Sequence, residues 1–386
     1  MTNKCSSRTE RITQSEIRAM TLACQKVKGI NMAQGVCNLG VPEPVARGVT
    51  RAIADGYNSY TKYSGLPELR TALAQKMGAY NQLPTDPEQE IVISAGATGA
   101  FYSACLALLE PGDEVILFEP YYGYHLNMLL ALELVPKFVP MQPPEWTFTQ
   151  AQLDAAVSPR TRAIVVCTPG NPSGKVYSQD ELRLLGAFAG RHDLFVLSDE
   201  TYEYFLYDGR RHISPGSLPG LRERTITIGS YSKTYSITGW RIGYSVQDRR
   251  WTEAIGYMND LIYVCAPAPL QIGVAAGITE LGCDFYTGLS VEFLAKRQQI
   301  CEALERAGLR PYVPQGAYYV LADVSHLPGQ TSKERAMYLL EKTGVATVPG
   351  SAFYSGRGGE HLVRFCFAKE AAELDAACDR LAACRT

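Results

Sequence analysis

A lysine among hydroxyl side chains, with an arginine shortly after it, is the most chemically suggestive feature of this sequence. Ser230, Tyr231, Ser232 and Lys233 follow a short apolar run, and Arg241 comes eight residues after the lysine. A lysine amine can form a Schiff base with an aldehyde, and a guanidinium can bind a phosphate through two hydrogen bonds. The spacing is therefore typical of a lysine that holds a phosphorylated aldehyde cofactor, although a lone lysine of this kind is more often an ordinary surface residue.

Three other segments carry polar side chains where strands are expected to end. Asp199 directly follows an apolar run, and Asn171 lies in a Thr-Pro-Gly-Asn-Pro-Ser-Gly turn. Gly96, Ala97 and Thr98 lie between an apolar run and a helical pattern, so backbone N–H groups and the Thr98 hydroxyl can face an anion. Each feature also has a purely structural interpretation: a capping aspartate, a common Asn-Pro turn, or close packing at a glycine.

Short apolar runs alternate with longer amphipathic segments through the first two thirds of the chain. The runs are rich in β-branched or aromatic residues and are bounded by turn residues, which predicts strands with helices between them. The expected strands are 91–94, 114–118, 163–167, 194–198, 225–228 and 241–246, and the expected helices include 98–109, 123–132 and 178–190. This alternation predicts an α/β fold with a mostly parallel sheet and helices on both faces.

The pattern changes after about residue 280. The elements expected there are a long helix at 285–308, a strand at 317–323, a helix near 332–343, a strand at 362–368 and a helix near 369–384. They predict a smaller α+β domain. We expect residues 48–284 to form the large domain, and residues 1–47 and 285–386 to form the small one.

The composition is that of a folded globular protein. The 386 residues are 46% hydrophobic and 20% charged, with a net charge of −2. This charge gives no electrostatic reason to expect nucleic acid or a membrane surface as a partner, so small molecules are the expected partners. No apolar run has the length of a signal peptide core or a membrane helix, which predicts a cytoplasmic protein. The eleven cysteines include no C-x-x-C pair and are expected to be reduced core thiols, with no metal site.

Several motifs together resemble the class I aminotransferases of the aspartate aminotransferase fold, which bind pyridoxal 5'-phosphate. The motifs are SYSKTYSITGWRIGY around Lys233, SDETY at 198–202 and TPGNPSG around Asn171. They occur in the family's order, and the resemblance runs from about residue 31 to about residue 368. The strings YYGYH, TPGNPSGKV and RFCFAK are similar to the kynurenine, glutamine and aromatic branch. The resemblance implies a fold type I enzyme that transfers the amino group of an L-amino acid to a 2-oxo acid by a ping-pong reaction.

The resemblance also implies roles for individual residues. Lys233 matches the lysine that forms the Schiff base and later moves a proton at the substrate Cα. Asp199 matches the carboxylate that pairs with the pyridine nitrogen. Asn171 and Tyr202 match the pair that hydrogen-bonds the cofactor's phenolic oxygen, and Tyr122 matches the aromatic residue that stacks on the pyridine ring.

Further matches concern the phosphate and the substrate. The residues expected around the phosphate are Gly96, Ala97, Thr98, Ser230 and Arg241. Tyr60 matches a tyrosine that reaches the phosphate of the partner subunit, which implies a homodimer with shared active sites. Arg364 matches the arginine that binds the substrate α-carboxylate, with Asn171 beside it, and Gly35 lies where the N-terminal segment closes over the substrate.

Two departures from the family pattern bear on the substrate. Ala97 stands where several relatives that use aspartate have a lysine for the side-chain carboxylate, and the segment after Gly35 lacks the common Pro-Asp-Phe. The first departure disfavours aspartate, and the second indicates a different substrate entrance. Two alternatives stay open: a C–S β-lyase or other Cα chemistry on the same scaffold, and a ligand-sensing regulator. The intact Lys233 and the lack of a preceding helix-turn-helix motif disfavour the regulator.

Overall fold

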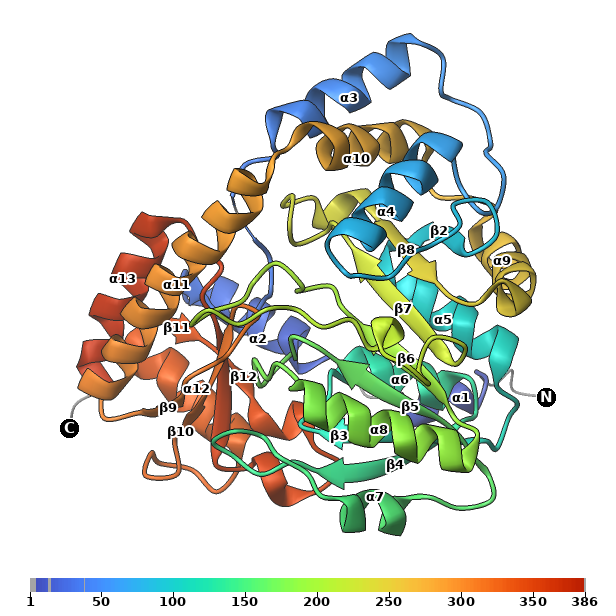
Figure 1. The fold of residues 1–386 in the computed structure, drawn as a ribbon. Coiled ribbons are helices and arrows are strands. Elements are labelled where there is room, and N and C mark those ends of the chain that lie inside the picture. The colour runs from blue at the N-terminus through green and yellow to red at the C-terminus, as the bar shows by residue number, and fades with distance from the viewer. Residues whose placement is uncertain (1–4, 13–14, 38, 385–386) are drawn as a thin grey trace.

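The computed structural model describes residues 5–12, 15–37 and 39–384. Its largest element is a seven-stranded sheet of order β2-β8-β7-β6-β5-β3-β4 (Figure 1). The strands are β2 (Ile91–Ala95), β3 (Glu114–Glu119), β4 (Val135–Pro140), β5 (Thr161–Cys167), β6 (Phe195–Asp199), β7 (Thr225–Ser230) and β8 (Ile242–Val246). β8 runs antiparallel to both its neighbours and the other pairs are parallel, which confirms the predicted mostly parallel sheet.

Alternate side chains of the central strands pack into two cores, one on each face of this sheet. The covering helices are α5 (Gly96–Leu108), α6 (Gly123–Ala131), α7 (Gln150–Ala156), α8 (Gln179–His192) and α9 (Arg249–Tyr263). Val115 and Leu117 pack with α5, α6 and α9, whereas Ile116 and Phe118 pack with α7 and α8. Because successive side chains of a strand point to opposite faces, this packing confirms the prediction of helices on both faces.

A third group of helices covers the β2–β8 edge of the sheet. It consists of α3 (Glu43–Ala54), α4 (Pro67–Ala79) and α10 (Ala268–Glu280), and their apolar side chains pack against β2 and β8. Figure 1 shows α3, α4 and α10 together at this end of the molecule. These three helices were not among the elements predicted from the sequence.

The C-terminal part forms a second, antiparallel sheet of order β12-β13-β10-β9. Its strands are β9 (Arg310–Tyr312), β10 (Tyr319–Asp323), β12 (Val348–Pro349) and β13 (Leu362–Cys366), with helices α11 (Cys283–Arg306), α12 (Ser332–Thr343) and α13 (Ala371–Leu381). The predicted elements of this region are present. The first helix among the described residues is the short α1 (Arg8–Arg11).

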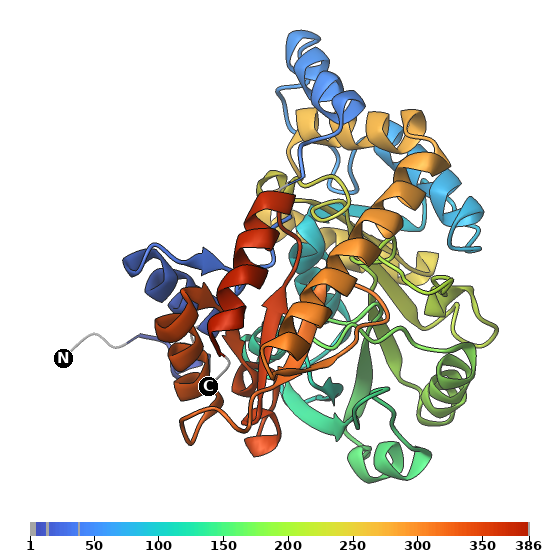
Figure 2. The ribbon, with the colours of Figure 1, turned by 90° about the vertical axis from the view of Figure 1, so that its left-hand side faces the viewer.

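The N-terminal segment joins this C-terminal part. Strand β1 (Ile30–Asn31) pairs in parallel with β11 (Val345–Ala346), and α2 (Glu16–Lys26) buries Met20 and Cys24 in the same core as α12 and α13. Figure 2 shows this blue segment beside the orange and red C-terminal elements. The predicted domain boundaries at 47/48 and 284/285 stay a prediction.

Two predicted strand starts were wrong because a residue at each start adopts left-handed backbone angles. Arg241 has φ +57° and lies outside the strand, which begins at residue 242. Ala317 has φ +58°, so β10 begins at residue 319 rather than 317. A left-handed residue breaks the extended strand conformation. The predicted strand at 362–368 ends earlier, at Cys366.

The sequence predicted that the cysteines are reduced core thiols and that no helix spans a membrane. All eleven cysteines are free thiols and seven are buried, but Cys5 and Cys283 are exposed, so the prediction of core thiols was wrong for these two. Among the residues that the structure describes, no helix combines the length and the apolar character needed to cross a membrane.

Candidate active site

A cavity of about 500 Å³ lies where the parallel strands of the large sheet end. Cys167, Asp199 and Ser230 contribute from the ends of β5, β6 and β7, which is the edge where ligands of α/β sheets bind. Tyr319 and Arg364 contribute from the second sheet. The predicted site residues that line the cavity are Gly35, Ala97, Thr98, Tyr122, Asn171, Asp199, Tyr202, Ser230, Lys233, Arg241 and Arg364. The structure thus brings eleven positions from distant parts of the sequence to one cavity.

Lys233 follows β7 and extends into the cavity. Its Nζ donates a hydrogen bond to the backbone carbonyl of Gly35 at 2.9 Å. Burial, the largest cause, lowers the pKa of Lys233 to about 8, with smaller contributions in the same direction from the guanidinium groups of Arg241 and Arg364 and opposing ones from the thiols of Cys366 and Cys37. A substantial fraction of this amine is therefore neutral near physiological pH, as a nucleophile or a general base must be.

Asp199 is the last residue of β6, and it is buried. Its Oδ2 lies 3.0 Å from His125 Nε2, and its Oδ1 accepts from the hydroxyl and the backbone N–H of Thr201, at 2.8 and 3.2 Å. Burial alone would raise the pKa of Asp199, but the hydrogen bonds from His125 and Thr201 outweigh it and hold that pKa below its ordinary value. The cavity therefore contains a carboxylate that is charged at neutral pH.

Arg364 lies in β13, fully buried, on the side of the cavity that faces the second sheet. Its Nη1 donates to Asn171 Oδ1 at 2.8 Å, and its Nη2 donates to the Ala33 carbonyl at 2.6 Å. Its Nε is buried and has no hydrogen-bond partner among the described residues. A buried donor without an acceptor costs about 1–3 kcal/mol, so the guanidinium retains the capacity to bind an anion such as a carboxylate.

A second group of hydrogen-bond donors lies at the start of α5. Thr98, Ser230 and Arg241 line it, and the N-terminal N–H groups of the helix have no intrahelical partners. Gly96 has φ +72°, and a Cβ there would lie 2.4 Å from Arg241 Nη2, so glycine leaves the room that the guanidinium occupies. These donors suit a phosphate group.

Tyr202 and Tyr122 line the same cavity as Asp199. The Tyr202 hydroxyl lies 2.8 Å from the Tyr319 hydroxyl, and the Tyr122 ring packs edge-on against His125, with ring centres 5.2 Å apart. Tyr60 is different, because its side chain is 84% exposed and does not line the cavity. A single chain does not test its predicted role in a partner subunit.

Twelve residues of the cavity lining were not selected from the sequence, and they include Thr201, Ser232, His125 and Tyr319. Thr201 and Ser232 lie within motifs that were recognised, and His125 ends the YYGYH string, so sequence position was an available signal for them. Tyr319 stands in an ordinary strand pattern, and nothing in the sequence connects it with Tyr202.

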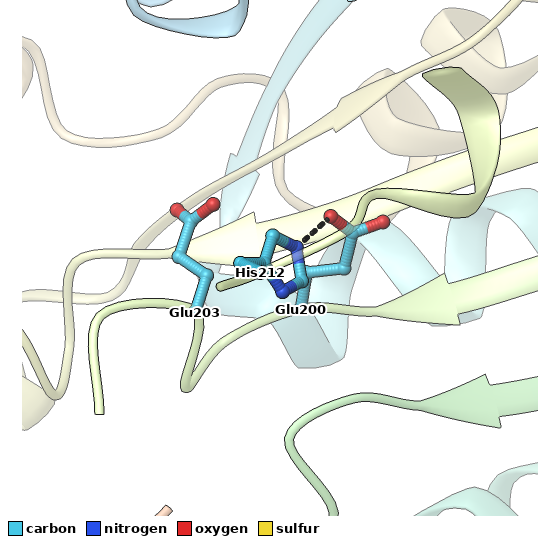
Figure 3. A group of neighbouring side chains, drawn as sticks. All are labelled: Glu200, Glu203 and His212. Carbon is cyan, nitrogen blue, oxygen red and sulfur yellow. Dashed lines mark hydrogen bonds and ion pairs between the residues drawn. The ribbon is translucent and has the colours of Figure 1, made fainter. Parts of the chain in front are cut away.

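A cluster of charged side chains supports the segment that carries Asp199 and Tyr202. Figure 3 shows Glu200 hydrogen-bonded to His212, with Glu203 beside them. Glu200 also accepts from two serine hydroxyls, and Glu203 is paired with Lys76 and Asn81. Because both carboxylates already have protein partners on each oxygen, we interpret the cluster as an anchor for residues 199–203 rather than as a metal site.

The sequence matches the family model for aminotransferases of class I and II over residues 27–381. The chain belongs to this family. It is 33% identical to rat kynurenine–oxoglutarate transaminase 3 over 379 residues, which cover 90% of this chain and 83% of the relative. It is 32% identical to the methionine aminotransferase of Escherichia coli strain K12 over 362 residues, 94% of each chain. The solved structure of N-succinyldiaminopimelate aminotransferase from Mycobacterium tuberculosis matches with a TM-score of 0.95 and 32% identity, over 99% of this chain and 100% of that one.

These similarities confirm three sequence-based predictions about this aminotransferase. The chain has the aspartate aminotransferase fold, it transfers an amino group between an amino acid and a 2-oxo acid, and it lies in the kynurenine and aromatic branch of the family. The roles of the individual residues are a separate question, which the geometry of the cavity addresses.

Proposed function

We propose that this aminotransferase binds pyridoxal 5'-phosphate through Lys233 and accepts L-amino acids with uncharged side chains. One observation carries the proposal. A single cavity contains an amine with a pKa of about 8, a buried carboxylate, and two guanidinium groups in different parts of its wall, at Arg241 and Arg364. When bound, the cofactor supplies an aldehyde that holds the amino group and a ring that withdraws electrons from the substrate Cα.

The proposed contacts to the cofactor follow from the chemistry of each group. Asp199 is charged and enclosed, so it would keep the pyridine nitrogen protonated. Thr98, Ser230 and Arg241 would hold the phosphate. Tyr122 lies in the wall beside His125, where its ring can stack on the pyridine.

The proposed contacts to the substrate lie on the opposite wall. Arg364 would bind the α-carboxylate through its unpaired Nε, with Asn171 fixing the guanidinium. This contact would orient the Cα–H bond toward Lys233, whose amine would take the proton from Cα. The free Lys233 amine donates to the Gly35 carbonyl, so this carbonyl could hold the amine once the substrate has displaced it from the cofactor.

We propose a substrate with an uncharged side chain because of the number of positively charged side chains that line the cavity. Among the described residues, the lysines and arginines that line it are Lys233, Arg241 and Arg364, and each already has a proposed partner. A side-chain carboxylate would find no further lysine or arginine in the part of the cavity lining that the structure describes. Ile17, Tyr124 and Met128 line the same cavity and suit an apolar or aromatic side chain. Kynurenine and methionine, after which two relatives are named, both have uncharged side chains.

A donor panel tests the proposed substrate class. The cofactor-loaded enzyme is mixed with single L-amino acids, and the visible cofactor absorbance is followed before and after addition of 2-oxoglutarate. We expect bleaching by kynurenine, methionine and aromatic donors, recovery with the oxo acid, and kcat/KM values above that for aspartate. A preference for aspartate would contradict the substrate class. Release of pyruvate and ammonia without recovery would indicate lyase chemistry instead.

We also propose that the active enzyme is a homodimer in which Tyr60 reaches the partner's phosphate site. The exposed side chains of Tyr60, Tyr257, Leu261 and Val264 support this, because the residues around Tyr60 pack against the end of α9. Large exposed apolar side chains that gather on one surface often mark an interface. The domain boundaries at 47/48 and 284/285 and a cytoplasmic location remain part of the same proposal.

Mixing two inactive variants tests the shared site. Tyr60→Asp and Lys233→Ala homodimers each lack one contribution to every site, whereas a mixed dimer contains one site with both native residues. We expect part of the activity to return after subunit exchange. If mass spectrometry detects the mixed dimer and no activity returns, Tyr60 does not act across the interface.

A further inference from the structure

The hydroxyl groups of Tyr202 and Tyr319 form a pair that joins the two sheets inside the cavity. Tyr202 follows β6 and Tyr319 begins β10, and their hydroxyl oxygens lie 2.8 Å apart. The two rings are nearly perpendicular, at 81°, and both side chains are buried. The geometry leaves open which hydroxyl is the donor, and the answer decides what Tyr202 can offer to a ligand.

We propose that Tyr319 is a positioning residue whose hydroxyl donates to Tyr202 and thereby directs the Tyr202 proton toward the cofactor's phenolic oxygen. This inference rests on the proposed function, in which Tyr202 contacts that oxygen. It assigns a role to a residue of the second sheet that no sequence motif marks.

Proton counting supports this direction. Burial raises the pKa of Tyr202 and of Tyr319 above the ordinary value of 10, so both phenols keep their protons at neutral pH. A phenol has one proton to donate. If Tyr202 donates its proton to the cofactor, it can only accept from Tyr319.

The charges around the pair favour the same direction. Burial dominates both pKa values, but Arg364 lowers the pKa of Tyr319, whereas the Asp199 carboxylate raises that of Tyr202. The Arg364 guanidinium lies 4.3 Å from the centre of the Tyr319 ring. Tyr319 is therefore the better proton donor of the two. The other titratable groups that face the pair are Tyr122, Tyr318, Cys366 and Lys233.

The N-terminal segment fixes the position of the Tyr319 hydroxyl. A Cβ placed on Gly35 would lie 2.0 Å from this oxygen, so the hydroxyl lies directly against the Gly35 backbone. The carbonyl of the same glycine accepts from Lys233. Tyr319 thus contacts Tyr202, Arg364 and the backbone of Gly35.

The test is a spectrophotometric pH titration of the cofactor-loaded enzyme without substrate. Tyr319→Phe removes the donor, which weakens the hydrogen bond that Tyr202 makes to the negatively charged phenolic oxygen. The phenolic oxygen then holds more negative charge, so the proton on the imine nitrogen between Lys233 and the cofactor is bound more tightly. The midpoint of the visible absorbance change should therefore rise by roughly 0.1 to 0.7 pH unit. Tyr202→Phe should raise it more. The double variant should match Tyr202→Phe alone, because Tyr319 acts through Tyr202.

Steady-state kinetics separate positioning from structural support. Tyr319→Phe keeps the ring beside Arg364, so KM for the amino acid should stay within about twofold of the wild-type value while the titration midpoint rises. Tyr319→Leu also removes the ring and should raise KM. A purely structural role would instead leave the midpoint unchanged in Tyr319→Phe.

A matched control exists elsewhere in the chain. Tyr235 and Tyr286 form another hydroxyl pair, 2.7 Å apart, and neither lines the cavity. Tyr286→Phe removes one hydroxyl from this pair and should leave the titration midpoint at the wild-type value.

The outcomes distinguish this inference from the proposed function. A wild-type midpoint in Tyr319→Phe, with a raised midpoint in Tyr202→Phe, overturns the inference alone. A wild-type midpoint in Tyr202→Phe overturns the cofactor contact of Tyr202 and the inference with it. If Tyr319→Phe does not fold, 3-fluorotyrosine at position 319 provides a stronger donor. It should lower the midpoint, and an unchanged or higher midpoint would overturn the inference.

Discussion

Replacing Asp199 by asparagine removes the charge that the proposed mechanism places at the pyridine nitrogen. The amide keeps the shape of the side chain and can still accept from Thr201 and bond to His125, so the fold around β6 should persist. What is lost is one partner of a buried charge pair, a change that costs about 3–5 kcal/mol. Since about 1.4 kcal/mol corresponds to a factor of ten, proton removal from the substrate Cα should slow by about 10²- to 10⁴-fold.

A single-turnover assay measures this loss. The cofactor-loaded variant is mixed with an amino donor in a stopped-flow instrument, and the rate of the first half-reaction is compared with that of the unaltered enzyme. Cofactor content, measured from the bound absorbance, should stay near one per chain. A rate within about tenfold of normal would show that another group holds the ring nitrogen.

Asp193 provides the control, because it stands just before the same strand with a side chain that is 98% exposed. Asp193→Asn makes the same chemical change without altering the cavity, and asparagine tolerates the left-handed backbone at this position. The half-reaction rate of this variant should equal that of the unaltered enzyme. A comparable slowing in both variants would attribute the effect to the strand rather than to the charge at Asp199.

Three further predictions concern the lysine and the two groups of hydrogen-bond donors. Because burial lowers the pKa of Lys233 from 10.5 to about 8, attachment of the cofactor to cofactor-free protein should accelerate with rising pH and level off above about pH 8; a midpoint near 10 would contradict this. Gly96→Ala, whose Cβ would lie 2.4 Å from the Arg241 guanidinium, should raise the cofactor dissociation constant by about tenfold or more, whereas Gly112→Ala, at φ +91° with open surroundings, should not. Arg364→Lys should raise KM for the amino acid by about 10- to 100-fold at unchanged cofactor affinity. If the affinities for the amino acid and for the cofactor fell equally, Arg364 would lie outside the substrate site.

Much of the site could be predicted because strand ends and turn motifs are local features. Asp199 and Ser230 end neighbouring parallel strands, and parallel strands end at the same edge of the sheet, so their proximity follows from the order of the elements. Lys233 follows three residues after Ser230. Asp199, Ser230 and Lys233 all line one cavity in the structure.

The contacts that the sequence could not indicate join residues far apart in the chain. His125 and Asp199 are 74 positions apart, and Tyr202 and Tyr319 are 117 apart. Their meeting depends on how α6 and β10 pack against β6, which no local pattern encodes. Strand β4 was missed for a different reason: Pro136 and Pro140 disfavour a strand, and the sheet accommodates them only because β4 is an edge strand.

The most direct test of the account is to locate the cofactor on the chain. Reduction of the loaded enzyme with borohydride fixes the cofactor to its lysine, and peptide mapping by mass spectrometry then identifies the site. We predict one pyridoxyl group per chain, on Lys233, and none after reduction of the Lys233→Ala variant. A pyridoxyl group on another lysine, with Lys233 unmodified, would contradict the central claim.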